Sequence, residues 1–259
     1  MSAGMSAGLS ARLRKPLRSR ADLGAVLAGT WSGLSAAEVA RRPVPVDGGS
    51  SVPLGDLFEV AGEPAGRIRF EGDLTRADRL GAGLTEGEVI IDGGVGDEAG
   101  IGMSGGVIDV RGDAGARTGG AEADARRGMT GGELLVRGDT GPEPGTRMRR
   151  GLLVVMGSVA SHAGPGMIAG TVIVFGNAGP APGRWSKRGS IVALGPVEIP
   201  PTYRYACTYQ PDHLRLTLMR LRKRYDLAVD ERYVSGLYRR YSGDLADLGR
   251  GEILAWTAE

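Results

Sequence analysis

The side chains best suited to chemistry are few and lie far apart in this 259-residue sequence. The two histidines, His162 and His213, are 51 residues apart, and the single cysteine, Cys207, is close only to the second. A zinc site needs Cys or His ligands at short spacings such as C-x-x-C or H-E-x-x-H, and neither pattern occurs. Nucleophilic catalysis needs a base beside a serine or cysteine, and no local signature marks such a pair. We therefore expect neither a catalytic residue nor a metal ligand in this chain.

Basic side chains form the one charged pattern with regular spacing. There are two groups of cations, and two units of the repeat described below separate them. We name them together the basic corner: Arg147, Arg149 and Arg150 in the first group, and Arg184, Lys187 and Arg188 in the second. Stacked repeats would place both groups on one edge, near Arg126 and Arg127. Such an edge suits a polycarboxylate or an acidic partner, although a solvated edge or salt bridges to another subunit would leave the same pattern. Nucleic acid is disfavoured because Trp185 is the only aromatic residue among these cations.

Three acidic residues in predicted turns raise the question of a calcium site. Asp73, Asp113 and Asp139 each follow a glycine that closes an apolar run. The nonapeptide pattern of calcium-binding β-rolls is absent, so we expect these carboxylates to bond the backbone of their own turns. The phosphate-loop sequence G-x-x-x-x-G-K-[ST] is absent too, so we assign the glycines to structure.

Glycines recur with a period of about 20 residues, which indicates a solenoid. They close apolar runs at Gly72, Gly93, Gly112, Gly138, Gly157, Gly176 and Gly195, so the successive intervals are 21, 19, 26, 19, 19 and 19. Most units continue as G-x-x-G-x-x-x-G, and the longest carries about seven extra residues near 120–126. The runs are short and rich in β-branched residues, so they are predicted to be strands. The sequence thus predicts an all-β chain, a right-handed parallel β-helix of about six or seven coils.

Alternation along the predicted strands separates an inward face from an outward face. The inward positions form one ladder: Val89, Ile91, Ile108, Val110, Leu134, Val136, Leu153, Val155, Val172, Val174, Ile191 and Ala193. A second ladder, at a coil corner, consists of Leu84, Met103, Met129, Met148 and Met167. Filling a corner explains these methionines better than binding of a soft metal.

The outward face changes character along the stack. Early coils place Asp92, Asp109, Arg111 and Arg137 there. Later coils place apolar residues at the same positions, namely Val154, Met156, Ile173, Phe175, Val192 and Leu194. An apolar patch across three neighbouring strands needs a cover, either the C-terminal segment or another subunit. We assign these six residues to an interface.

The flanks of the repeats differ from them in composition. We divide the chain into an N-terminal arm and cap (1–66), the β-helix (67–199) and a C-terminal helical and capping segment (200–259). Ser35 and Glu38 form a capping-box pattern before a short helix. Apolar residues three to four apart predict a helix over 213–225. A second short helix is expected to include Val234, Leu237, Tyr238 and Tyr241.

Composition bounds the location and the partners. No apolar run approaches the roughly 18 residues that cross a bilayer, and the first residues lack the apolar core of a signal peptide. One cysteine fits a reducing compartment. A net charge of +2 neither requires nor excludes nucleic acid. We expect a cytoplasmic protein with no membrane or nucleic-acid partner.

The glycine array and its flanks resemble the C subunit of the formylmethanofuran dehydrogenase family, over roughly residues 20–256. The returns at 102–106 (GMSGG) and 128–132 (GMTGG) carry the resemblance within the repeats. Outside them it rests on the segments 57–62 (LFEVAG), 205–211 (YACTYQP) and 243–254 (GDLADLGRGEIL). The same β-helix forms the C-terminal domain of the glutamate synthase large subunit, whose flanks fit less well. Ala160 departs from the pattern at a turn glycine, and 147–150 (RMRR) replaces a G-M-x-G return.

The resemblance implies a role in one-carbon metabolism. The family has an archaeal branch of tungsten or molybdenum dehydrogenases and a bacterial branch, the formyltransferase/hydrolase complex, to which the composition is more similar. In that complex formyl-tetrahydromethanopterin passes its formyl group to a methanofuran-type carrier (methylofuran), and hydrolysis gives formate during formaldehyde oxidation. The formyltransferase (D) and amidohydrolase-like (A) subunits, together with the B subunit, would hold the chemistry. The C subunit would be their scaffold in a hetero-oligomer.

The resemblance also implies a ligand for the basic corner, because methanofuran-type carriers have glutamate-rich tails. No cofactor is expected on this chain alone. The C subunit of a dehydrogenase, a stand-alone structural β-helix and an enzyme with its own site remain the alternatives.

Overall fold

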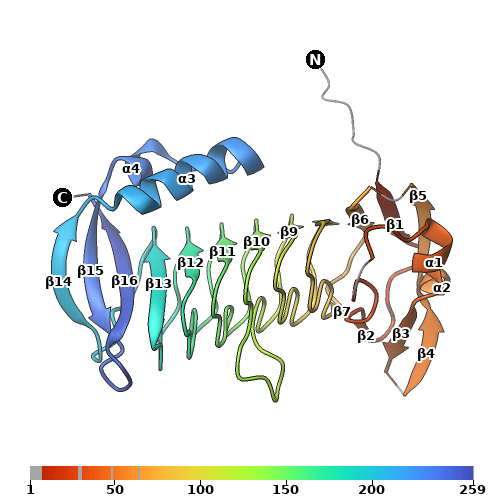
Figure 1. The fold of residues 1–259 in the computed structure, drawn as a ribbon, viewed down its shortest axis with the longest axis horizontal. Helices are drawn as coiled ribbons and strands as arrows, with labels where there is room; N and C mark the ends of the chain where they lie inside the picture. Colours follow the sequence, from red (N-terminus) through yellow and green to blue (C-terminus); the bar gives the residue numbers. More distant parts are fainter. Residues whose placement is uncertain (1–7, 29–30, 48, 64, 259) are drawn as a thin grey trace.

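The repeats form one large sheet in which successive strands are parallel neighbours (Figure 1). The computed structural model of the protein describes residues 8–28, 31–47, 49–63 and 65–258. Within these residues a twelve-stranded sheet has the order β14-β15-β16-β13-β12-β11-β10-β9-β8-β6-β1-β5. Its central strands are β6 (Arg67–Glu71), β8 (Glu88–Asp92), β9 (Val107–Val110), β10 (Glu133–Val136), β11 (Leu152–Val155), β12 (Thr171–Val174) and β13 (Arg188–Ala193). The chain is predominantly β-structure, as the sequence predicts.

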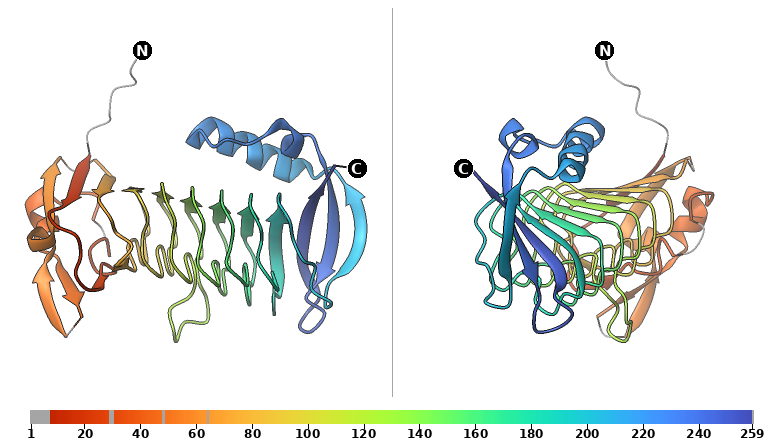
Figure 2. Two further views of the ribbon diagram at one scale, coloured as in Figure 1. Left: turned by 180° about the vertical axis from the view of Figure 1, so that it is seen from behind. Right: turned by 60° about the vertical axis from the view of Figure 1, so that its left-hand side comes forward.

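The remaining elements lie at the two ends of this stack of coils (Figure 2). The N-terminal end contains β1 (Leu9–Leu13), β2 (Ala21–Asp22), α1 (Ala36–Ala40), β3 (Pro43–Val46), β4 (Ser50–Pro53), α2 (Leu54–Leu57), β5 (Phe58–Gly62) and β7 (Ala77–Asp78). The C-terminal end contains β14 (Arg204–Tyr209), α3 (Asp212–Tyr225), α4 (Glu231–Val234), β15 (Leu237–Gly243) and β16 (Arg250–Thr257). From that end α3 runs back along the stack, over one side of the strands.

Neighbouring strands pair in the register that the glycine period predicts. Leu134 lies opposite Ile108 on one side and Leu153 on the other, and Val172 follows opposite Leu153. Every residue of the predicted inward ladder is buried in a single apolar core. The methionine ladder lies in the same core, so its role as a corner filler is confirmed. The core therefore runs the length of the stack.

The connections between strands stack in the same register. Parallel bridges outside the main strands join Leu74, Val95, Ala114, Thr140 and Val159 in succession. A column of glycines follows, with φ between +64° and +76°: Gly81, Gly100, Gly119, Gly145, Gly164 and Gly183. A Cβ at Gly100 would lie 2.5 Å from Leu134 Cδ1. Because this column combines positive φ with a position against the core, only glycine fits it.

Aspartates in the turns join one coil to the next. Asp113 Oδ1 accepts a hydrogen bond from the backbone N of Asp139 (2.8 Å), and Asp139 Oδ1 accepts one from Ser158 N (2.7 Å). The expectation that these carboxylates bond their own turns is therefore wrong for both. It is confirmed for Asp73, which accepts from Thr75 N two residues ahead (3.1 Å).

The C-terminal segment covers the apolar outward face of the later coils. Leu214, Leu218 and Leu221 of α3 pack on that face in a second core. Four of the six predicted outward residues are at most 2% exposed, namely Val154, Ile173, Val192 and Leu194. Met156 and Phe175 are half-buried against the same core. Of the two covers expected for this face, the structure shows the C-terminal segment, so these residues form an interface within the chain.

The second predicted C-terminal helix is shorter than expected. α4 ends at Val234, and the three residues expected to extend it, Leu237, Tyr238 and Tyr241, lie in β15. β15 pairs antiparallel with both β14 and β16, so its residues are held in a sheet. The buried Tyr238 hydroxyl donates to Tyr233 O (2.7 Å), and burial raises the pKa of Tyr238.

The N-terminal end closes the stack with a strand and a short helix. β1 runs parallel to β6 and antiparallel to β5, so residues 9–13 of the predicted arm form the leading strand. The capping box is confirmed at α1, where Ser35 and Glu38 bond each other's backbone N–H. The rest of the arm, 1–7, lies outside the described residues.

Thr140 provides a test of the bridge column. The residue is 4% exposed, and its backbone bridges to Ala114 on one side and Val159 on the other. Its Oγ1 has no hydrogen-bond partner among the described residues. Thr140→Val should raise the free energy of unfolding by about 1 kcal/mol, because a buried unpaired hydroxyl is lost without a change of shape. Thr118→Val is the control: Thr118 Oγ1 donates to Gly115 O (3.0 Å), so its loss should destabilise. Equal effects in urea unfolding would contradict this interpretation.

Gly183 tests the glycine column where it meets the C-terminal cap. Its φ is +71°, and a Cβ there would overlap the hydroxyl of Tyr203, which donates to Gly183 O (2.9 Å). Gly183→Ala should cost about 2 to 4 kcal/mol in calorimetric unfolding. Ala181→Gly, also at positive φ (+51°) but half-exposed, should change stability by less than about 1 kcal/mol. A tolerated Gly183→Ala would show that the column can relax.

Candidate functional site

Four residues of the basic corner occupy equivalent positions two coils apart. The backbone N atoms of Arg149, Ile168 and Lys187 each donate to a methionine carbonyl of the preceding coil, at 2.8 Å in all three cases. Arg149 and Lys187 are therefore in register, and so are the residues that follow them, Arg150 and Arg188. At about 4.8 Å per coil the charges of each pair are anchored roughly 10 Å apart along the edge. The structure thus brings these four cations onto one edge.

Arg147 and Arg184 belong to the same corner but are not equivalent. Arg147 has φ +53°, and its register partner two coils on is Trp185, at φ +60°. The Nη1 of Arg147 donates to Ala125 O in the extra loop (2.9 Å). The guanidinium of Arg184 lies 4.0 Å from the centre of the Trp185 ring. The predicted pairing of Arg147 with Arg184 is therefore offset by one residue.

The cations of the basic corner form no ion pair with the residues that the structure describes. In the part of the chain that the structure describes, none of its six cations has a carboxylate within 4.0 Å. Arg149 is half-exposed and the others are exposed. Unpaired cations along one edge attract anions over roughly a Debye length, about 8 Å at physiological ionic strength. The corner can therefore hold an extended polyanion.

The extra loop of the longest repeat projects beside this corner (Figure 1). It is anchored by the Ala125–Arg147 hydrogen bond at one end. At the other end both carboxylate oxygens of Glu122 accept from Arg79, each at 2.7 Å. Arg126 and Arg127 remain exposed between these anchors and the next coil, and they add to the positive charge of the corner.

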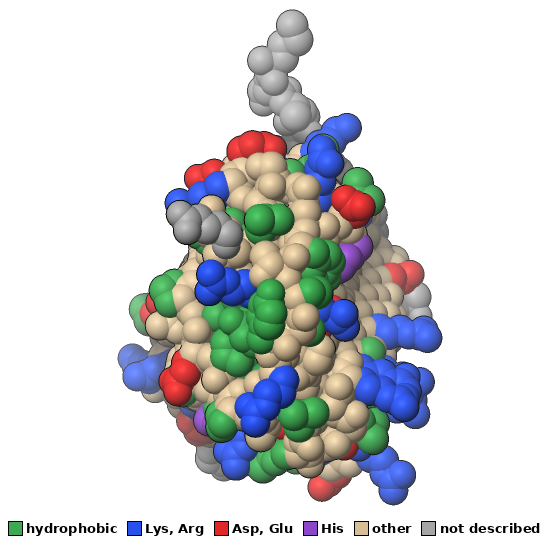
Figure 3. Space-filling model, turned by 90° about the vertical axis from the view of Figure 1, so that its left-hand side faces the viewer, with side chains coloured by type: hydrophobic (Ala, Val, Ile, Leu, Met, Phe, Trp, Pro, Cys, Tyr) green, Lys and Arg blue, Asp and Glu red, His purple; other side chains and the backbone are tan. Residues whose placement is uncertain are grey.

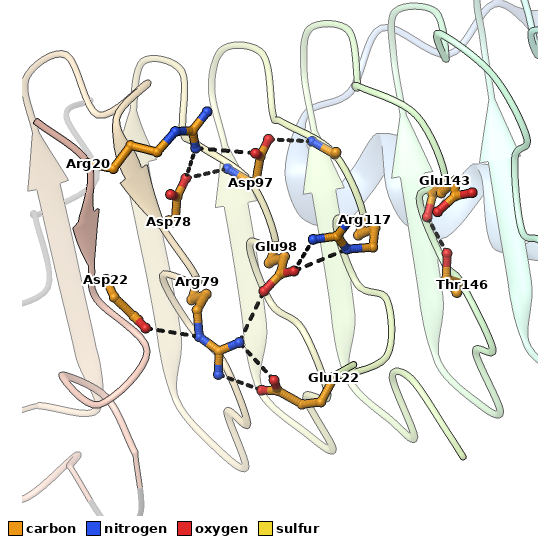
Figure 4. Close-up of polar contacts among 11 residues, drawn as sticks. Arg20, Asp22, Asp78, Arg79, Asp97, Glu98, Arg117, Glu122, Glu143 and Thr146 are labelled. Atoms are coloured by element: carbon orange, nitrogen blue, oxygen red, sulfur yellow. Dashed lines mark hydrogen bonds and ion pairs between the residues drawn. The ribbon is translucent and has the colours of Figure 1, made fainter. Parts of the chain in front are cut away.

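A second ladder of charges is paired throughout (Figure 4). Arg79 bonds Glu98 (3.0 Å) and Glu122, and it lies 3.3 Å from Asp22. Glu98 also accepts from Arg117 Nε (3.1 Å). The hydrogen bond to Glu122 raises the pKa of Arg79 above its ordinary value. This ladder fastens the N-terminal segment, the early coils and the extra loop together, so we assign it to stability.

The polar outward positions of the early coils are paired as well. Arg111 lies 2.9 Å from Asp92, and Arg137 makes two hydrogen bonds to Asp109 (2.9 and 3.0 Å). Arg137 also donates to Tyr225 O at the end of α3 (3.0 Å), which fixes the helix against the sheet. These charges replace the apolar contacts that α3 makes with the later coils.

The groups considered for catalysis or metal binding stay apart. His162 lies in a turn at φ +53°, Cys207 is exposed on β14, and His213 is in the first turn of α3. No group of three His, Cys, Asp or Glu side chains among the described residues is arranged to hold a metal ion. Of the helices within those ranges, none has the length and apolarity to span a membrane.

Two polar features of the surface were not predicted, and the sequence holds a signal for only one of them. Asp113, Asp139, Ser158 and Asn177 recur at the 26- and 19-residue spacing of the glycines, which marks them as a ladder of side-chain acceptors. The hub role of Arg79 has no such signal, because its partners come from three separate segments.

The known proteins that this chain resembles are C subunits of two related enzyme complexes. No protein-family model matches the sequence. The C subunit of the formyltransferase/hydrolase complex Fhc of Methylorubrum extorquens is 36% identical over 88 residues, which cover 33% of this chain and 32% of that protein. The C subunit of tungsten-containing formylmethanofuran dehydrogenase 2 of Methanothermobacter wolfeii is 42% identical over 60 residues, or 21% of this chain and 22% of that protein. The chain spans a third or less of the length of these curated relatives.

A solved structure extends the match to nearly full length. It is the X-ray crystal structure of the formyltransferase/hydrolase complex from Methylorubrum extorquens in complex with methylofuran. One chain of it superposes with a TM-score of 0.79 and 34% identity, over 95% of this chain and 98% of that chain. Similarity of this extent in both sequence and structure reflects a shared family. The chain belongs to the C-subunit family of formyltransferase/hydrolase complexes and formylmethanofuran dehydrogenases.

Proposed function

We propose that this chain is the non-catalytic scaffold, the C subunit, of a formyltransferase/hydrolase complex. The complex would convert formyl-tetrahydromethanopterin to formate through a formylated methanofuran-type carrier, in the oxidation of formaldehyde. The observation that carries the proposal is the 34% identity over 95% of the chain with a chain of such a complex. The A, B and D subunits would be its partners and hold the chemistry, in the cytoplasm.

A second candidate is the C subunit of a tungsten or molybdenum formylmethanofuran dehydrogenase. It is favoured by the 42% identity to the Methanothermobacter wolfeii protein, but over only 21% of this chain. The match to the protein of the hydrolase complex covers 33%. The longer match and the full-length superposition favour the hydrolase complex.

The scaffold would be a right-handed parallel β-helix over 67–199, between an N-terminal arm and cap (1–66) and a C-terminal helical and capping segment (200–259). Two observations support this architecture. Successive strands pair in parallel without slippage, and the returning connections form their own parallel bridges between the same coils. A parallel crossover connection is right-handed in nearly all proteins. Such a rod gives partner subunits a rigid common surface.

The basic corner would contact the glutamate-rich tail of the carrier. Its support is the exposure of Arg147, Arg150, Arg184, Lys187 and Arg188, together with their lack of carboxylate partners among the described residues. A spacing of roughly 10 Å suits carboxylates that recur along an extended chain, because residues there rise about 3.3 Å each. The tail would then stay bound to the complex while its formylated end moves between active sites.

Purification from the native host tests the scaffold role. A tagged chain should co-purify with formyltransferase and amidohydrolase-like subunits, and native mass spectrometry should give one assembly that contains all of them. Tungsten or molybdenum in that assembly would point to the dehydrogenase instead. A monodisperse chain without partners would contradict both assignments.

Charge reversal tests the role of the basic corner. The variant Arg149→Glu/Arg150→Glu/Lys187→Glu/Arg188→Glu should slow the coupled conversion of formyl-tetrahydromethanopterin to formate by about 10-fold or more at low salt, because the track for the tail is lost. The formyl transfer and the hydrolysis, each assayed alone, should keep their rates.

The control carries the same change of charge elsewhere, on exposed cations without carboxylate partners among the described residues: Lys15→Glu/Arg41→Glu/Arg215→Glu/Lys223→Glu. It should behave as the wild type. An unchanged coupled rate in the corner variant, within an intact complex, would refute the proposed tail contact.

A further inference from the structure

Trp185 combines an exposed side chain with a backbone conformation that suits glycine. Its φ is +60°, a region that residues with a Cβ rarely occupy. Gly83, Gly102 and Gly166 hold the equivalent position in other coils, at φ +62° to +66°, and Arg147 holds it at +53°. A Cβ at Gly83 or Gly102 would have nothing within 4 Å, so the position faces away from the core. The indole is accordingly 54% exposed and contributes nothing to the core that would explain the strain.

The surroundings hold Trp185 in a fixed place. Asp244 is 2% exposed, and its Oδ2 accepts from Trp185 N (2.8 Å) while its Oδ1 accepts from Ala246 N (2.9 Å). One buried carboxylate thus joins the Trp185 corner to the turn between β15 and β16. That turn exposes Leu245 and Leu248, each at 56%. We name Trp185, Leu245 and Leu248 the apolar tip.

Cations surround the apolar tip. The Arg184 guanidinium stacks on the indole at 4.0 Å. Arg188 and Arg250 lie side by side as partners in β13 and β16, and Lys187 precedes them. None of the four has a carboxylate within 4.0 Å in the described ranges, and Asp247 is an exposed acidic residue of the same turn. Exposed apolar side chains therefore lie beside exposed cations at this end of the molecule, where Figure 3 shows hydrophobic and basic side chains intermixed.

We propose that the apolar tip docks an acidic segment of another subunit, which places an apolar side chain against Trp185 and carboxylates on Arg184 and Arg250. Tryptophan is enriched among the residues that dominate binding energy, and the stacked Arg184 orders the indole before binding. A second copy of this chain is disfavoured because its own cations would meet these. The inference rests on the proposed function for the existence of partner subunits, and it adds the place and the chemistry of one contact.

The decisive variant is Trp185→Gly in the co-expressed complex. Glycine adopts the backbone conformation of Trp185 (φ +60°) freely, so the full-length variant chain should unfold at a temperature no lower than the wild type. In the complex, the dissociation constant of the docked subunit should rise by at least about 30-fold, as for an interface hot spot. Dilution of the complex, followed by native mass spectrometry, measures that constant. The variant removes no charge, so the proposed track for the carrier tail is kept.

Leu216→Ala is the control, because Leu216 is an exposed apolar residue too (67%) but lies on α3, away from the tip. It should leave the dissociation constant unchanged. Wild-type affinity in the Trp185→Gly complex would overturn the docking inference alone. A variant that changed only the self-association of the isolated chain would overturn it too, by identifying a second copy as the occupant. A wild-type chain without any partner subunit would overturn the proposed function as well.

Discussion

The rest of the structure depends on backbone hydrogen bonds that run from each coil to the next. A coil can bond its neighbours all the way round only if its turns fall at the same points, and this requirement fixes both the 19-residue period and the glycine column. Any stack of this kind leaves unbonded backbone at its two ends. The chain closes the first end with β1 and β5 and continues the sheet through β16, β15 and β14 at the other. The repeating coil therefore requires a cap at each end as well as an apolar core.

The side chains on the outer surface of the coils differ in the partners that they find within the chain. The apolar strand face of the later coils packs under α3, and the polar strand face of the early coils is joined by ion pairs such as Arg137–Asp109. The basic corner has no carboxylate partner among the described residues, and the apolar tip leaves Trp185, Leu245 and Leu248 exposed. They are adjacent, because Arg184 of the basic corner stacks on Trp185 of the apolar tip. Function is therefore expected where folding leaves charge and apolar surface uncompensated.

The features that follow from the repeat period could be predicted from the sequence. The contacts between segments far apart in the chain could not. Register counting gave the inward ladder, the methionine corner and the alignment of Arg149 with Lys187. It gave no means to decide what covers the apolar strand face, because α3 is remote in sequence and an amphipathic helix or another subunit would satisfy the same pattern. The spacing of three to four residues before Tyr238 and Tyr241 predicts a helix, and pairing with β14 and β16 overrides it to make a strand.

The extended coil has a consequence for how such proteins change. Equivalent turn residues are 26 positions apart across it instead of 19, yet Leu134 still pairs with Ile108 as if the loop were absent. A corner can thus lengthen without any adjustment by its neighbours, whereas one residue added within a strand would turn core residues outward. Evolution, or an engineer grafting a peptide, can add recognition loops at the corners of this rod one at a time, while the coil beneath keeps its dimensions.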